Sequence, residues 1–92
     1  MPVVEISPAF RRSFKKFVAK HPNLQKDIAA VLKQLEVNPR EAWLETHKLR
    51  GAWAGYLACS AGYDLRIIFL FVDNKPEDNI LLVDIGTHDE VY

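Results

Sequence analysis

Apolar and polar residues alternate with two periods along the chain, a helical period in the first half and a strand period in the second. Residues 3–6 (VVEI) form a short candidate strand, and Ser7 and Pro8 follow it as a typical helix start. Serine suits the N-cap, and proline suits the first helical position. Apolar residues then recur every three or four positions with Arg and Lys between them, which predicts an amphipathic helix with a basic outer face. The apolar positions are Phe10, Phe14, Phe17 and Val18.

A second helix is predicted after His21 and Pro22, because the residue before a proline avoids the helical region and proline can start a new helix. Asn38 and Pro39 mark its end. Its apolar stripe comprises Leu24, Ile28, Val31, Leu32 and Leu35. The two segments together predict a helical hairpin.

From Trp53 onwards the period becomes two, which predicts three strands after an irregular segment at residues 40–52. A short turn near Ala61 and Gly62 joins the first two strands, and the polar segment DNKPEDN joins the second and third. The middle strand is apolar on both faces, so we expect it at the centre of a sheet that the helices cover on one side. The strands are residues 52–60 (AWAGYLACS), 63–72 (YDLRIIFLFV) and 79–86 (NILLVDIG).

The predicted fold class is therefore α+β, with an N-terminal strand, a helical hairpin and a mainly antiparallel sheet of three to four strands. The other face of the sheet is expected to be concave. Residues 40–52 and the C-terminal residues are expected to rim that face.

The composition is that of one globular domain, residues 1–92, with 49% hydrophobic and 26% charged residues. The longest apolar run, IIFLFV, is too short to span a membrane, and MPVVEIS lacks the layout of a signal peptide. Cys59 is the only cysteine, so an internal disulfide is excluded. These features predict a cytoplasmic protein without a membrane partner.

The charges sum to zero but are unevenly distributed. Residues 1–50 hold ten Lys and Arg against five Asp and Glu, whereas residues 51–92 hold two against seven. A basic half of this size can bind a phosphate backbone or an acidic partner. The alternative is that the Lys-rich helices are simply well solvated.

His47 and His88 are the candidate catalytic residues, because each lies where irregular chain meets a strand. An imidazole can take and give a proton near neutral pH, and Asp64, just after the predicted turn, can orient it or act as a base. The alternative is three unconnected surface residues. His21 lies at a helix junction, where a local role as a cap or turn residue is expected.

Cations and aromatic residues surround these candidates in the sequence. Lys48, Arg50 and Arg66 are candidate phosphate ligands, or else solvated charges or partners of nearby carboxylates. Trp53 and Tyr56 are three residues apart, so one is expected in the core while the other can stack on a base.

Other chemistries have weaker signals. No HxH or HxxxH spacing supports a metal site among His47, Asp64, Asp84 and His88. Cys59 lies inside a predicted strand and is expected to be a buried apolar residue. The glycine-containing stretches are not followed by helices, so a nucleotide-binding loop is not expected.

Three stretches together resemble the RelE/ParE superfamily of toxins from bacterial type II toxin–antitoxin modules, and most of all its RelE/StbE and YafQ-like branch. They are ISPAFRRSFKKF, HKLRGAWAGYLACSAGYDLRIIF and DIGTHDEVY, and the resemblance covers nearly the whole chain. It implies a RelE-like fold and an endoribonuclease that enters the ribosomal A site and cuts mRNA there. It also implies a cognate antitoxin, which wraps the toxin and often represses the shared operon by binding operator DNA with it.

The resemblance also implies an active site. In YafQ-like toxins, histidines occupy the positions of His47 and His88, an aspartate that of Asp64, and an aromatic residue that of Tyr92. The implied chemistry needs no metal or other cofactor: the 2′-hydroxyl of the RNA attacks the adjacent phosphate. His88 and His47 then divide the acid and base roles, Asp64 orients or acts as a base, and Tyr92 stacks on or orients a nucleobase. The cations Lys48, Arg50 and Arg66 stabilise the negative charge that builds on the phosphate.

The sequence departs from this pattern at three positions. Ser60 stands where YafQ-like toxins have a third histidine, Leu65 where they have an aromatic residue, and Asp64 where RelE-type toxins often have an arginine. The isoelectric point, about 6.8, is also low for a ribosome-binding toxin. Two alternatives therefore stay open: a toxin without nuclease activity that acts as an antitoxin-binding co-repressor, and a ParE-like inhibitor of DNA gyrase.

Overall fold

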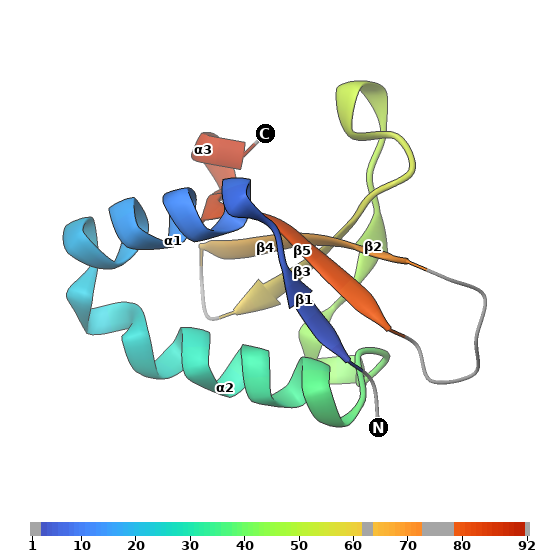
Figure 1. Cartoon of the computed structure of the whole chain (residues 1–92), viewed down its shortest axis with the longest axis horizontal. Helices are drawn as coiled ribbons and strands as arrows, with labels where there is room; N and C mark the ends of the chain where they lie inside the picture. Colours follow the sequence, from blue (N-terminus) through green and yellow to red (C-terminus); the bar gives the residue numbers. More distant parts are fainter. Residues whose placement is uncertain (1–2, 62–63, 73–78, 92) are drawn as a thin grey trace.

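A computed structural model describes residues 3–61, 64–72 and 79–91, which form one sheet with a helical hairpin on one side (Figure 1). The strand order is β1-β5-β4-β3-β2; the β1–β5 pair is parallel and the other pairs are antiparallel. The strands are β1 (Val4–Ile6), β2 (His47–Lys48), β3 (Leu57–Ala61), β4 (Leu65–Phe71) and β5 (Ile80–Thr87). The helices are α1 (Pro8–Lys20), α2 (Gln25–Val37) and α3 (His88–Val91), with the 3-10 turns η1 (Pro22–Leu24), η2 (Ala42–Leu44) and η3 (Gly51–Trp53). Within the described ranges, no helix has the length and apolar character needed to cross a membrane.

The hairpin forms where the sequence predicts it. The Ser7 side chain accepts a hydrogen bond from the main-chain N–H of Phe10 at 3.0 Å, which caps α1. The second helical segment begins at Pro22 as a 3-10 turn and continues as α2, which ends at Val37 before Asn38. The α+β class, the N-terminal strand and the hairpin are therefore confirmed.

The main core lies between the hairpin and one face of the sheet, here called the helix-covered face. Its fully or nearly buried side chains come from both helices, from the turn η2 and from the three longest strands. The alternate residues Leu65, Ile67, Phe69 and Phe71 of β4 all contribute to it, as the period-two pattern predicts. The core comprises Phe10, Phe17, Ile28, Val31, Leu35, Leu44, Cys59, Leu65, Ile67, Phe69, Ile80, Leu82 and Ile85.

The opposite side of the sheet, here called the open face, carries a smaller apolar cluster. Its buried members are Ala58 of β3, Ile68 of β4 and Val91 of α3. Residues paired across antiparallel strands point to the same face, so the register places further side chains beside them. One row across the open face is His47, Ala58, Ile68 and Asp84, and the next row is Ser60, Arg66 and Gly86.

The first predicted strand, residues 52–60, begins too early. Residues 51–53 form the 3-10 turn η3, and β3 begins only at Leu57. Gly51 and Gly55 have φ angles of 66° and 95°, which bend the chain twice before β3 starts. The segment 40–52, predicted to be irregular, contains β2, and this short edge strand is the fifth strand of the sheet. The predicted connections at Gly62 and at residues 73–78 lie outside the described residues.

Replacing Leu35 tests how much the helix-covered core contributes to the free energy of unfolding. Leu35 on α2 is 0% exposed, so Leu35→Ala should lower the free energy of unfolding by about 2–5 kcal/mol. Val37→Ala, two residues further along the same helix at 53% exposure, should change it by less than about 0.5 kcal/mol. Urea titration of both variants measures the difference. Equal effects would contradict this account of the core.

Candidate active site

Asp64 and His88 are brought together by the register of β4 and β5. Leu65 pairs with Thr87, so the residues flanking this pair, Asp64 and His88, face each other at the end of the two strands. The main-chain N–H of His88 donates to the carbonyl oxygen of Asp64 at 3.1 Å and to its carboxylate Oδ1 at 3.3 Å. Asp64 therefore fixes the main chain of His88, the first residue of α3.

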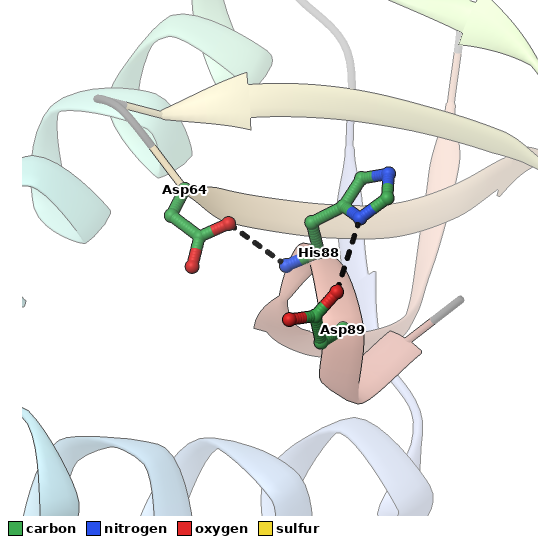
Figure 2. Close-up of polar contacts among 3 residues, drawn as sticks. All are labelled: Asp64, His88 and Asp89. Carbon is green, nitrogen blue, oxygen red and sulfur yellow. Dashed lines mark hydrogen bonds and ion pairs between the residues drawn. The ribbon is translucent and has the colours of Figure 1, made fainter.

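The imidazole of His88 points away from Asp64 (Figure 2). Its Nδ1 atom lies 3.6 Å from Oδ1 of Asp89, and the His88 side chain is 54% exposed. Asp89 was not singled out in the sequence as a neighbour of the imidazole. The only signal available was that the two residues are neighbours in the chain.

His47 lies on the edge strand β2 and is exposed. Its Nδ1 atom is 3.1 Å from the main-chain oxygen of Glu45. Because a carbonyl oxygen can only accept, this contact is a hydrogen bond when Nδ1 carries the proton, and Nε2 is then the basic nitrogen. Glu45 adopts a left-handed conformation with φ of 51°, which turns the chain directly before β2.

A hollow of about 480 Å³ joins His47 to two of the predicted cations. The sequence places these residues within a few positions of one another, and the turn η3 folds the segment back so that Trp53 also reaches the hollow. The lining residues are His47, Lys48, Leu49, Arg50, Ala52 and Trp53. The hollow therefore combines an imidazole, two cations and an aromatic ring at the β2 edge of the sheet.

Arg66 lies on β4 between the two histidines. The register places it on the open face beside Ser60 and Gly86. Its Nη1 atom donates to the carbonyl oxygen of Leu65 at 3.0 Å. His47 is three strands away from β5, which corresponds to roughly 14 Å across the sheet. The strand order therefore places Arg66 between His47 on β2 and His88, which directly follows β5.

The remaining candidates divide between the two faces. Cys59 is buried on the helix-covered face, and this burial raises the pKa of its thiol to about 12. Trp53 and Tyr56 pack edge to face at 5.4 Å, and both are partly buried against the open-face cluster. In the described part of the chain, no group of three or more His, Cys, Asp or Glu side chains gathers in a way that could hold a metal ion. Tyr92 lies outside the described residues.

Solved structures of bacterial toxins share this fold. YafQ from E. coli strain BL21(DE3) matches with a TM-score of 0.78 at 20% identity, over 100% of this chain and 99% of that one. A metal-bound toxin from Helicobacter pylori matches with a TM-score of 0.75 at 26% identity, over 100% of both chains. A YoeB/ParE toxin from Agrobacterium tumefaciens matches with a TM-score of 0.71 at 12% identity, over 94% of this chain and 98% of that one. The fold is therefore that of the RelE-like toxins, as the resemblance implied.

A match in sequence identifies the family of toxins to which the chain belongs. Residues 3–92 match the family model of the bacterial toxin of type II toxin–antitoxin systems, YafQ. The chain belongs to the YafQ family of type II toxins. No curated protein matches it.

The pKa of Cys59 leads to a test of thiol reactivity. Only the thiolate reacts rapidly, and the thiol stays protonated in the folded protein up to about pH 12. At pH 8 the native protein should therefore react with iodoacetamide at least 100-fold more slowly than the chain unfolded in guanidinium. Because the folded-state pKa is raised, the contribution of Cys59 to stability is complete below its unfolded-state pKa and declines as the pH rises above that value. Rapid labelling of the native protein at pH 8 would contradict this burial.

Proposed function

We propose that this YafQ-family chain is a ribosome-dependent endoribonuclease that cleaves mRNA in the A site. The observation that carries the proposal is the placement of His47 and Arg66 on the open face, with His88 at the start of α3, which packs on that face through Val91, and with Lys48 and Arg50 in the adjoining hollow. Two proton-transfer groups on either side of a cation suit a phosphodiester that needs a base, an acid and charge stabilisation.

The proposed reaction is an in-line attack within the RNA. A general base removes the proton from the 2′-hydroxyl, and the 2′-oxygen forms a bond to the adjacent phosphorus. The bond from phosphorus to the 5′-oxygen of the next nucleotide breaks, and a general acid protonates that oxygen. The products are a 2′,3′-cyclic phosphate and a free 5′-hydroxyl, so no water or redox partner is consumed.

His47 and His88 share the two proton transfers. A well-placed acid or base typically contributes about 10²–10⁴-fold to the rate, so loss of either imidazole should be severe. The imidazole of His88 has its Nδ1 atom 3.6 Å from the carboxylate of Asp89. His47, in the tautomer with Nδ1–H directed at Glu45, presents Nε2 for proton transfer.

The cations and the remaining site residues act on the phosphate and the bases. Arg66 lies beside Gly86, whose missing side chain gives the guanidinium room to meet a phosphate on the open face. Lys48 and Arg50 would hold the flanking backbone in the hollow. Asp64 supports His88 through its main chain, and Tyr92 is assigned to stacking on a nucleobase.

A cognate antitoxin is the proposed partner, and the toxin–antitoxin complex is proposed to bind operator DNA. The support for the antitoxin is the E. coli DinJ–YafQ toxin–antitoxin complex, which matches this chain with a TM-score of 0.75 at 20% identity, over 99% of this chain and 97% of that one. The cytoplasm, where translating ribosomes are found, is the proposed location.

One observation favours a second function, that of a toxin fold which binds an antitoxin without cutting RNA. Ser60, which stands where YafQ-like toxins have a third histidine, pairs with Arg66 on the open face, so this departure bears directly on the site. Leu65, where they have an aromatic residue, is instead buried on the helix-covered face at 1% exposure. The replacement of an aromatic residue by Leu65 therefore removes no side chain from the open face.

Cleavage of mRNA on translating ribosomes, mapped by primer extension, tests the proposal. Wild type should cut at defined codon positions, and His88→Ala should reduce cleavage at least 100-fold because a proton-transfer group is lost. The melting temperature should be nearly unchanged, since the His88 side chain is 54% exposed.

The matched control is His21→Ala, a histidine whose ring packs on Phe17 at 4.7 Å at the end of α1, away from the open face. This variant should retain cleavage. A well-folded wild type that makes no cuts would refute the nuclease and favour the binding function. A large loss of stability in His88→Ala would instead assign His88 a structural role.

A further inference from the structure

The last helical element, α3, is too short to be stable alone. It has four residues, His88–Val91, whereas isolated helices shorter than about 12 residues are marginal in water. Contacts from other elements must therefore fix its position, and with it the direction of the His88 imidazole. The first end of α3 is held by Asp64, as described above.

The second end of α3 is held by Trp53. The indole Nε1–H donates to the main-chain oxygen of Val91 at 2.9 Å, across 38 residues of sequence. The last carbonyl groups of a helix have no partner within the helix, so this donor satisfies one of them. The Val91 side chain is 6% exposed and packs with Ala58 and Ile68, which draws α3 onto the open face.

Trp53 also lines the hollow that contains His47, Lys48 and Arg50. Trp53 therefore contacts both halves of the proposed active site, which otherwise lie on opposite edges of the open face. Its own position is fixed by the two glycine turns and by the edge-to-face contact with Tyr56. A phenylalanine could fill the space, but only tryptophan supplies the N–H.

We infer that Trp53 is a positioning residue, which fixes α3 through the Val91 carbonyl and so sets the imidazole of His88 against the cationic hollow. This inference rests on the proposed function for its catalytic consequence. Its structural part, that the indole N–H holds α3 in place, stands independently of any activity.

The test is Trp53→Phe, which keeps an aromatic ring and removes the donor. The matched control is Trp43→Phe, because the indole of Trp43 also donates, to Oε1 of Gln34 on α2 at 3.2 Å, but Trp43 is exposed and is not among the residues of the open-face cluster. Amide hydrogen exchange of His88, followed by NMR on the full chain, reports on α3 directly. Loss of one hydrogen bond should speed this exchange about five- to tenfold in Trp53→Phe and leave it unchanged in Trp43→Phe.

Cleavage kinetics on programmed ribosomes provide the second readout. Trp53→Phe should lower kcat about tenfold and leave KM within twofold, because substrate binding by the cations is retained while the imidazole is misplaced. In the His88→Ala background, Trp53→Phe should cause no further loss of the residual single-turnover rate, since a residue that acts through His88 has nothing left to position.

The outcomes separate this inference from the proposed function. Unchanged His88 exchange, or an equal loss of rate with and without His88, would overturn the inference and leave Trp53 as a packing residue. Faster exchange in a protein whose wild type makes no cuts would refute the nuclease while supporting the role of Trp53 in holding α3.

Discussion

The antiparallel register of β4 and β5 is the constraint on which the open face depends. It sets Asp64 opposite His88 across 24 residues of sequence, and it sets Arg66 beside Gly86. Because side chains alternate along a strand, a slip of one residue would carry Arg66 into the helix-covered core and expose the apolar residues beside it. The core on one face thus enforces the register, and the register arranges the charged groups on the other. Packing and chemistry are therefore two consequences of the same strand pairing.

The sequence predicts the hairpin well because its signals are local. Ser7 caps the first helix with its side chain, Pro8 occupies the first helical position, and the second helix ends before the extended main chain of Asn38. The strand predicted from residue 52 fails for the opposite reason. Its alternation is genuine, but Gly51 and Gly55 can adopt either sign of φ, and only the packing of the intervening residues selects the turns.

In the candidate site, the sequence indicates which residue types are present but not how their side chains are oriented or what they contact. Histidine, aspartate and cations at the ends of predicted elements identified the region, because those residue types can transfer protons and bind phosphate. No sequence pattern could show that Asp64 binds the main chain of His88 or that Asp89 lies by the imidazole. The contact between Trp53 and Val91 was equally hidden, since it exists only once α3 has folded over the sheet.

The parallel pairing of β1 with β5 also governs how the chain can fold during its synthesis. Val4 pairs with Ile80, 76 positions later, and β5 is the last strand in chain order although it lies between β1 and β4. A nascent chain that has not reached β5 leaves β1 without a partner and one edge of β4 open. Such distant pairings form slowly, and unpaired edges invite association with other chains. The sheet, and with it the open face, is therefore completed only after β5 has emerged from the ribosome that makes the chain.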